Sequence, residues 1–400
     1  MSSRVAAITG LGVVAPCGVG VEEFWEGLGT EPGPRSQPLR IDAFDPSRWF
    51  GPKDLRRVDR FTQLAVAAAT MALEDAALED DGVAGGSLDP ARSGVLVATG
   101  VGGLASYDQQ LRVLQERGPG RVSPFLIPML MPNAASAAVS LRLGWTGPCE
   151  TITTACAAGT HGVAAGARWV EAGRCDIVLA GASEGHPTPV GMAGFANMTA
   201  LSPRGFSQPF DVDRDGFVAS EGAAMLVLEE LASARARGAH VYAVILGSAS
   251  NADAHHLTAP AEAGAGALAC MRLALDDAGL LPADIAHVNA HGTSTPLNDA
   301  AEATALTTLF GGPGPPVTSI KGVLGHAFGA AGALEAAAAA LTIDRGAIPP
   351  TAGHRTPDPR IDLDVVSGGW RTVPPGPVLS TSFAFGGHNG CLVLAPPPAT

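Results

Sequence analysis

The chain has 400 residues, of which 46% are hydrophobic and 16% charged, and 51 glycines are spread along it. That composition is typical of a compact α/β protein with a large buried core and excludes a disordered chain. The formal net charge of −13 argues against a nucleic-acid partner. The six cysteines form neither a CxxC pair nor a Cys/His cluster at zinc spacing, so we expect reduced thiols and no bound metal.

The apolar stretch 5–19 at the start of the chain is interrupted by glycines and Pro16, and acidic residues follow it. This pattern predicts a strand and turn rather than a signal peptide. The longest Ala-rich run, 336–340, is far too short to span a bilayer. We therefore expect a cytoplasmic protein without a membrane partner.

Short apolar strands alternate with Ala-rich helices along most of the chain. The clearest strands are expected at 95–99, 177–180, 225–228 and 287–290. Such alternation predicts an α/β fold with parallel sheets covered by helices. Because the strands are apolar throughout, the sheets are expected to be buried on both faces.

A weak internal repeat divides the chain. Cys156 and His326 are each expected to open a helix that carries glycines on one face. Small residues at helical spacing allow close packing, so we expect these two helices to meet at the centre. The boundary is expected near residue 240, which divides the chain into halves 1–240 and 241–400.

Cys156 stands where a polar strand end runs into a stretch of small residues. A cysteine in such surroundings is more often core packing than a nucleophile. At a helix start, however, unpaired N–H groups and the positive dipole end stabilise a thiolate. Together with His291 and His326, each in a Gly-flanked segment, this position suggests acyl-thioester chemistry.

His291 ends a predicted strand and precedes a turn rich in Gly, Thr and Pro. The imidazole either satisfies loop carbonyls or marks a site at the C-terminal end of the strand, where α/β sheets place their sites. Thr293 and Thr295 in the same turn can offer hydroxyls to an amide-bearing substrate arm.

Lys321 and Glu335 flank His326 in the sequence. They form either a solvated surface pair worth under about 1 kcal/mol or a buried ion pair that holds the loop. Their apolar surroundings favour the buried pair.

Two glycines, Gly386 and Gly387, follow Phe385 and predict a tight backbone turn. Such a turn either aims an N–H group at a developing oxyanion or simply connects two strands. Taken alone, it favours the simple connection.

Taken together, and in their order along the chain, the segments described above resemble the condensing enzymes, the beta-ketoacyl-acyl-carrier-protein synthases. The likeness is greatest to 3-oxoacyl-acyl-carrier-protein synthase II and the ketosynthases of type II polyketide assembly. It covers nearly the whole chain and is carried by Cys156 and the segments 209–222, 251–260, 289–296, 321–335 and 383–387.

The resemblance implies the thiolase fold, in which two similar halves form five αβαβα layers. It also implies an acyl-carrier-protein partner, and either a homodimer or a heterodimer with a chain-length-factor homologue. No metal or organic cofactor is implied, because the acyl groups arrive already activated as thioesters.

The resemblance further implies a Cys-His-His site. Cys156 would hold the acyl group, while His291 and His326 would assist decarboxylation of a malonyl-carrier protein in fatty-acid or polyketide biosynthesis. The backbone N–H groups of Cys156 and Phe385 would form the oxyanion hole.

The supporting residues are assigned on the same resemblance. Lys321 and Glu335 would be the supporting ion pair, and Thr293 and Thr295 would contact the pantetheine arm. The remaining substrate-binding positions are Phe385, Gly386, Gly387 and Tyr107.

Two positions depart from the family pattern. Ala384 stands where glycine is usual, which would either stiffen the loop beside the oxyanion hole or alter how Phe385 swings. Tyr107 aligns with a residue that tunes acyl-pocket depth at the dimer interface, so the primer is expected to be short or the pocket re-routed. The simpler interpretation of Tyr107 is an exposed residue on a helix.

The acidic carrier protein must dock on a chain that is itself acidic, which requires a local cationic patch. The candidates are Arg56, Arg57, Arg60, Arg121 and Arg204. Each is otherwise a solvated surface arginine.

Two alternatives belong to other functional classes. A non-catalytic chain-length partner would lack the nucleophilic cysteine, which Cys156 supplies here. A thiolase-like acyltransferase would not decarboxylate its substrate and needs a second catalytic cysteine. Cys391 lies near a Gly-rich loop but is expected within the last strand.

Overall fold

The computed structural model describes residues 4–78 and 88–399, and ten of its strands follow one hydrogen-bonded path. The first half of the path contains, in spatial order, β4 (Cys149–Glu150), β3 (Ser93–Ala98), β5 (Ile177–Glu184), β6 (Gly222–Glu230) and β1 (Ala6–Ala15). The second half contains β7 (Ala243–Ala252), β13 (His388–Ala395), β12 (Val378–Ala384), β8 (His287–Asn289) and β9 (Val317–Thr318).

The two halves repeat one pattern of strand direction. From β1 outward, and again from β7 outward, the first two pairings are antiparallel and the last two are parallel. The halves meet where β1 pairs antiparallel with β7, with Ala6 opposite Ile245. This repetition confirms the duplicated fold. We infer that the boundary lies near residue 240, between α8 (Leu231–Ala236) and β7.

The expected parallel pairing is confirmed only for the outer strands, because the inner pairings of each half are antiparallel. Only three residues, Phe385–Gly387, separate β12 from β13, and a connection that short can join only antiparallel neighbours. Parallel pairing occurs farther out, where helices connect the strands. The predicted burial of the strands is confirmed, because β3, β5 and the first eight residues of β6 are buried.

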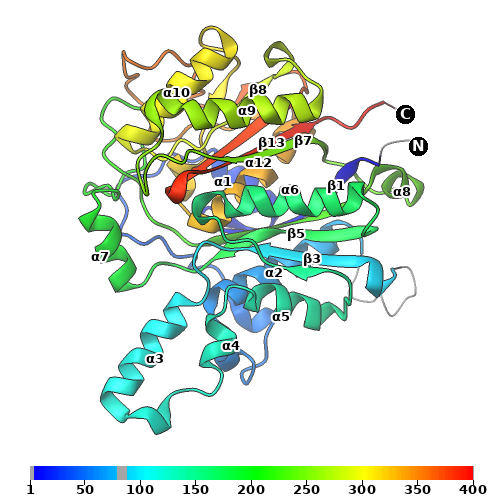
Figure 1. Ribbon diagram of the computed structural model, residues 1–400, viewed down its shortest axis with the longest axis vertical. Coiled ribbons are helices and arrows are strands. Elements are labelled where there is room, and N and C mark those ends of the chain that lie inside the picture. The colour runs from blue at the N-terminus through cyan, green and yellow to red at the C-terminus, as the bar shows by residue number, and fades with distance from the viewer. Residues whose placement is uncertain (1–3, 79–87, 400) are drawn as a thin grey trace.

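Helices and sheets stack in five layers (Figure 1). The first outer layer contains α2 (Arg60–Asp75) and α5 (Ala134–Leu143), the central layer α6 (Ala158–Glu171) and α12 (Ala331–Arg345), and the second outer layer α9 (Ala265–Ala278) and α10 (Pro296–Phe310). The two sheet halves lie between these layers, so α6 and α12 are covered on both sides. The other helices are α1 (Val21–Leu28), α3 (Leu104–Arg117), α4 (Leu126–Leu130), α7 (Pro189–Asn197) and α11 (Lys321–Leu324), and the short strands are β2 (Gly18–Val19), β10 (Ala347–Ile348) and β11 (Arg371–Thr372).

The two central helices pack through glycine, as the sequence predicts. A Cβ atom on Gly159 would lie 2.5 Å from the Ala333 backbone nitrogen, and one on Gly332 would lie 2.2 Å from the Thr160 hydroxyl. Neither position therefore has space for a side chain, and the backbones of α6 and α12 approach closely at the centre of the molecule.

The expected start of the second central helix is wrong. His326 lies in an extended bridge with Ala219, and its N–H donates to the Val218 carbonyl at 2.7 Å. The reason is Gly325, whose φ of 70° ends α11 and turns the chain away from helical geometry. The helix α12 begins only at Ala331. Cys156, by contrast, lies in a 3₁₀ turn immediately before α6, as expected.

Within the described ranges, no helix is long and apolar enough to cross a bilayer. The helices α3 and α4 project from the body of the molecule (Figure 1). They expose several large apolar side chains, namely Tyr107, Leu111, Leu114 and Ile127.

Candidate active site

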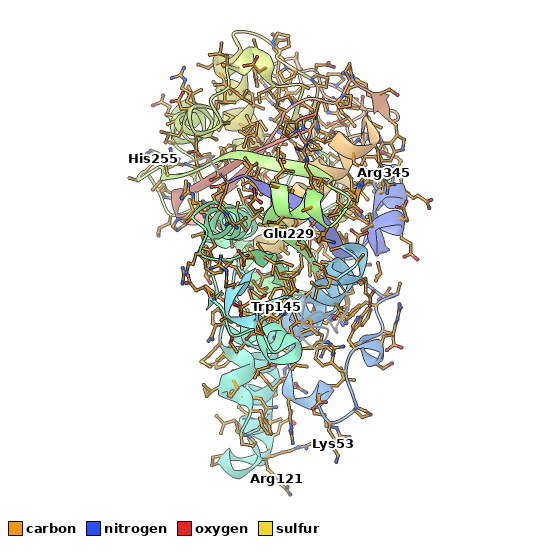
Figure 2. All side chains as sticks on the ribbon, turned by 90° about the vertical axis from the view of Figure 1, so that its right-hand side faces the viewer. Lys53, Arg121, Trp145, Glu229, His255 and Arg345 are labelled. Atoms are coloured by element: carbon orange, nitrogen blue, oxygen red, sulfur yellow. The ribbon has the colours of Figure 1, made fainter. Side chains whose placement is uncertain are left out.

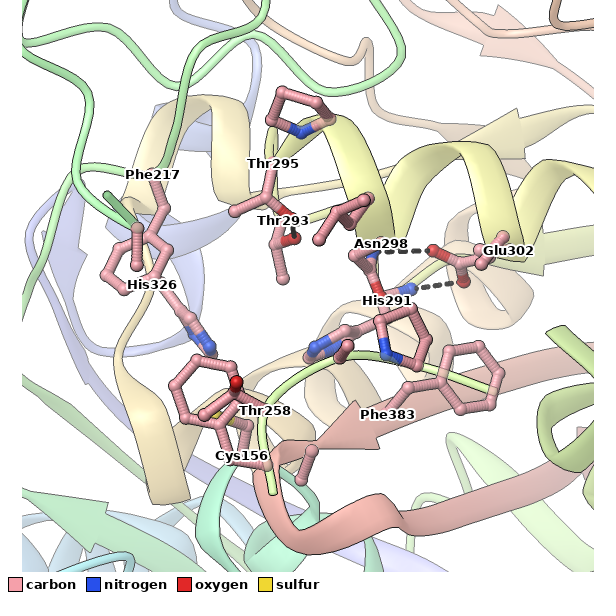
Figure 3. A pocket seen from close by; sticks show the side chains of 18 of the residues that line it. Cys156, Phe217, Thr258, His291, Thr293, Thr295, Asn298, Glu302, His326 and Phe383 are labelled. Carbon is pink, nitrogen blue, oxygen red and sulfur yellow. Dashed lines mark hydrogen bonds between the residues drawn. The ribbon is translucent and has the colours of Figure 1, made fainter. Parts of the chain in front are cut away.

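One cavity of about 510 Å³ brings the three predicted catalytic side chains together (Figure 3). Cys156 reaches it from the start of α6, His291 from the end of β8, and His326 from the segment before α12. The two imidazole rings lie 5.6 Å apart between centroids, at nearly a right angle. Thr293, Thr295 and Phe385 also line the cavity.

The backbone is strained beside each of the three side chains. Ala155, Ser294 and Phe328 are not glycines, yet they adopt φ values of 51°, 69° and 46°. Such conformations cost of order 1–3 kcal/mol each and persist where the surrounding structure enforces them, most often at functional sites. No sequence signal predicted these positions, because strain of this kind depends on tertiary packing.

The expected stabilisation of a Cys156 thiolate is wrong for the resting protein. Burial raises the pKa of the Cys156 thiol to about 12. The Lys321 ammonium acts in the opposite direction, while the carboxylates of Glu184 and Glu335 raise the thiol pKa further. The positive end of the helix dipole favours a thiolate, but desolvation of the buried thiol is the larger effect here.

We infer that the imidazoles of His291 and His326 are both neutral. Burial is the main cause that lowers the pKa of His291 and of His326 well below the usual range, and the Lys321 charge adds to it. Lys321 Nζ lies 3.3 Å from His291 Nδ1. Because an ammonium group can only donate, Nδ1 accepts, and we assign the ring proton of His291 to Nε2. His326 is held between Phe217, which meets its ring edge-on, and Phe328, which stacks on it.

The predicted buried ion pair forms between Lys321 and Glu335, whose side chains are only 2% and 1% exposed. Lys321 also donates to the backbone carbonyl of His291 at 2.6 Å. The Asn289 side chain donates to the Glu335 carbonyl at 2.8 Å. The pair therefore connects α12 to the end of β8 and fixes the backbone that carries His291.

The predicted tight turn after Phe385 is confirmed. Gly386 and Gly387 have φ values of 82° and 72°, and Gly386 N donates to the Leu257 carbonyl at 2.7 Å. Ala384 has extended backbone, so a side chain there causes no strain.

Glu302, which the sequence did not single out, lies behind His291 (Figure 3). Its carboxylate accepts the N–H groups of His291 and Gly292, both at 2.8 Å, and the Thr381 hydroxyl at 2.9 Å. A sequence signal was available. Glu302 lies on the same helical face as the buried Leu306 and Leu309, and an acid on an apolar stripe requires a buried partner.

Burial raises the pKa of Glu302 from 4.5 to about 7. The folded chain therefore binds this proton more tightly than the unfolded chain, and the resulting stability is lost as pH rises from about 4.5 through 7. We expect Glu302→Gln to remove about 3 kcal/mol of this pH dependence. Urea unfolding of both proteins across pH 4.5–8 measures it. Parallel stability curves would show that Glu302 does not titrate in this range.

Several predicted residues lie elsewhere. Tyr107 is 46% exposed on α3, outside the cavity lining. Arg60 forms an ion pair with Glu221 at 2.7 Å, and Arg204 forms one with Asp215 at 2.7 Å. Arg57 stacks over the Phe125 ring.

The last of the predicted arginines, Arg121, is exposed toward the same end of the molecule as Lys53 (Figure 2). Arg56 is also exposed.

Cys391 is fully buried in β13 and packs in the core beside α9. It is expected within the last strand, and the structure confirms that position. The cavity therefore has no second cysteine among the residues that line it.

Two family models match the chain. "Beta-ketoacyl synthase, N-terminal domain" matches residues 30–234, and "Beta-ketoacyl synthase, C-terminal domain" matches residues 242–355. The chain belongs to the beta-ketoacyl synthase family. It is therefore an acyltransferase with the thiolase-like fold, and both predictions are confirmed.

Curated relatives of this ketosynthase extend the match to nearly the full chain. 3-Oxoacyl-[acyl-carrier-protein] synthase 2 of Synechocystis sp. is 39% identical over 414 residues and covers 98% of both chains. The protein of the same name from Staphylococcus aureus is also 39% identical, over 412 residues, with 98% of each chain covered.

Solved structures agree with this assignment. The ishigamide ketosynthase/chain length factor superposes with a TM-score of 0.91 at 35% identity, covering 99% of this chain and 100% of that one. A second match is to a type II polyketide synthase acyl-carrier protein in complex with its ketosynthase bound to the hexaketide. Its TM-score is 0.89 at 31% identity, with 99% and 100% covered.

Proposed function

We propose that this protein is a 3-oxoacyl-acyl-carrier-protein synthase that condenses an acyl group on Cys156 with malonyl-carrier protein. The observation that carries the proposal is the meeting of one thiol and two neutral imidazoles in a single cavity. Fatty-acid elongation and type II polyketide assembly both use this chemistry.

The first half-reaction is transfer of the acyl group. Cys156 Sγ attacks the acyl-carrier thioester, the bond to the carrier sulfur breaks, and the carrier leaves as a thiol with the proton of Cys156. Holding the acyl group on the enzyme divides one difficult condensation into two easier steps. The raised pKa of Cys156 means that the thiol loses its proton as the substrate binds, rather than beforehand.

The second half-reaction begins with malonyl-carrier protein. Cleavage of its C–C bond releases CO2 and leaves an enolate, whose oxygen accepts hydrogen bonds from the imidazoles of His291 and His326. Neutral imidazole donors in a buried site stabilise this charge without a metal. The enolate carbon then attacks the acyl-Cys156 carbonyl, and the negative oxygen is held by the N–H groups of Cys156 and Phe385. Collapse releases the Cys156 sulfur and a 3-oxoacyl product two carbons longer.

The remaining cavity residues position the substrate. Thr293 and Thr295, whose hydroxyls lie 2.9 Å apart, face the cavity and can bind the amides of a pantetheine arm. The turn at Gly386 and Gly387 places Phe385 at the cavity wall. Lys321 and Glu335 hold the backbone of His291 rather than touch the substrate.

We assign an acyl-carrier protein as the partner and infer a dimer, with an identical chain or with a chain-length-factor homologue. The exposed apolar side chains of α3, Tyr107 among them, fit such an interface. We propose that Tyr107 reaches the acyl pocket only when a second subunit packs on this face. Arg56, Arg57 and Arg121 are the stronger docking candidates, because Arg60 and Arg204 form ion pairs. The cytoplasm is the proposed location, where the six free thiols would stay reduced.

Mass spectrometry of the intact protein tests the proposal. After incubation with a mixed pool of acyl-carrier proteins, we expect one acyl group per chain on the peptide containing Cys156. Adding malonyl-carrier protein should then discharge that label and release CO2. Cys149→Ala, which removes an exposed cysteine outside the cavity, is the matched control and should label normally.

Labelling at another cysteine, or labelling without release of CO2, would exclude the condensation. The second result would favour a non-decarboxylating acyltransferase, and no labelling at all would favour a non-catalytic subunit.

A further inference from the structure

Glu184, the last residue of β5, is a buried carboxylate to which the proposed mechanism assigns no role. It is 3% exposed, and no Lys or Arg side chain in the described ranges pairs with it. Its partners are instead four neutral donors. They are the N–H groups of Gly100 at 2.5 Å, Val101 at 3.3 Å and Gly329 at 3.1 Å, and the Thr99 hydroxyl at 3.2 Å.

These donors come from two segments that are far apart in the sequence. Residues 99–101 follow β3 and lead into α3, whereas Gly329 lies three residues after His326. The two segments touch directly, since a Cβ atom on Gly329 would lie 2.1 Å from the Gly100 nitrogen and 2.7 Å from the Glu184 carboxylate. Glycine is required there so that both backbones can reach the same carboxylate oxygen.

The segment that Glu184 binds also contains Phe328, the residue that packs against the His326 imidazole. Phe328, which precedes Gly329, stacks on the His326 ring with centroids 5.2 Å apart. Phe328 also has a φ of 46°, a strained conformation that needs an external restraint. The hydrogen bond from Gly329 N to Glu184 supplies a restraint at the next residue.

We propose that Glu184 is a positioning residue of this enzyme, which holds the Phe328–Gly329 turn in place and thereby fixes the His326 ring in the cavity. The inference rests on the proposed function, because it concerns the decarboxylation step. Glu184 acts through backbone and a phenyl ring, and it touches neither the substrate nor the imidazole.

Glu184 also affects the nucleophile from a distance. Its negative charge raises the pKa of Cys156, as does that of Glu335, while Lys321 lowers it. Removing the Glu184 charge should therefore make Cys156 more reactive, while displacing the turn should make decarboxylation slower. General damage to the fold would slow both reactions, whereas a positioning role predicts faster alkylation of Cys156 together with slower decarboxylation.

The test compares two variants with a matched control. Glu184→Asp keeps the charge but shortens the side chain, so it withdraws from Gly329. We expect kcat for malonyl decarboxylation to fall about tenfold or more, with KM within about twofold, because the substrate-binding residues are untouched. Alkylation of Cys156 by iodoacetamide at pH 8 should stay within about twofold of the wild type.

Glu184→Gln removes the charge and leaves a weaker acceptor. At pH 8, above the pKa of about 7 to which burial raises Glu184, we expect alkylation of Cys156 to become about threefold faster, while decarboxylation becomes about threefold slower. The control is Glu229→Gln, another buried carboxylate, which binds Thr9 and Arg237 outside the cavity lining. It should change neither rate.

The inference would be overturned if both Glu184 variants decarboxylated at the wild-type rate. It would also be overturned if the rate of Cys156 alkylation fell as much as the rate of decarboxylation. If the Asp variant does not fold, the Gln variant decides, and a decarboxylation rate equal to that of Glu229→Gln would overturn the inference. If the wild-type protein itself releases no CO2, the proposed function fails first, which separates the two outcomes.

Discussion

A protein carrying His326→Ala is expected to release CO2 from malonyl-carrier protein about 10²–10³-fold more slowly than the wild type, the usual loss when one donor to a developing oxyanion is removed. The imidazole is neutral, buried and held between two phenyl rings, so it can donate without reorganisation. Water entering the space left by the ring would donate less effectively, because it is not oriented in advance. Labelled CO2 release under saturating substrate measures the effect.

Acyl transfer to Cys156 provides the internal comparison for this variant. That step forms its oxyanion at the backbone N–H groups, so the transfer rate should fall less than about tenfold. His287→Leu is the matched control, since His287 is a fully buried imidazole without a hydrogen-bond partner among the described residues and outside the cavity lining. Equal losses in both half-reactions of His326→Ala would contradict the assignment of His326 to the decarboxylation step.

The sequence was most informative where a residue type has few structural uses. A glycine pair after Phe385 can only make a tight turn, and glycines at helical spacing can only permit close packing. Both features appeared as expected, at Gly386 and between Gly159 and Gly332. The same reasoning failed at His326, because Gly325 lies in a left-handed conformation that ends one helix rather than contributing to the face of the next.

Properties that depend on distant partners could not be predicted. The pKa of Cys156 is set by burial and by Lys321, Glu184 and Glu335, which lie between 28 and 179 residues away in the sequence. Likewise, Arg60 resembles a surface arginine until the fold brings Glu221 to it. Such pairings follow from tertiary packing, which no local pattern encodes.

The acids missed by the sequence analysis share one feature. Glu184 ends a fully buried strand, and Glu302 lies on the buried face of a helix. An acidic residue in an apolar segment is costly unless it is satisfied, so each such residue indicates a buried network of donors. In this protein both networks end at backbone N–H groups near His291 or His326, the proposed catalytic histidines.

Lys321→Met is expected to destabilise the protein by about 3–5 kcal/mol, because it leaves the Glu335 carboxylate buried without its cation. The pair is almost wholly excluded from water. The variant also loses the contacts from Nζ to His291 Nδ1 and to the His291 carbonyl, so condensation should fall together with stability. Urea unfolding at pH 7.5 measures the first effect, and CO2 release by the remaining folded protein measures the second.

The pH dependence of this loss identifies its cause. Burial already raises the pKa of Glu335, and removing Lys321, which opposes that rise, should raise it further. The variant can then relieve its strain by protonating Glu335, so its deficit in stability should shrink as the pH falls from 7.5 toward 5. The double variant Lys321→Met/Glu335→Leu removes both charges and should recover most of the lost stability, but not the activity, since His291 still lacks its support. A deficit that is independent of pH, or a double variant no more stable than the single one, would show that Lys321 contributes packing rather than charge.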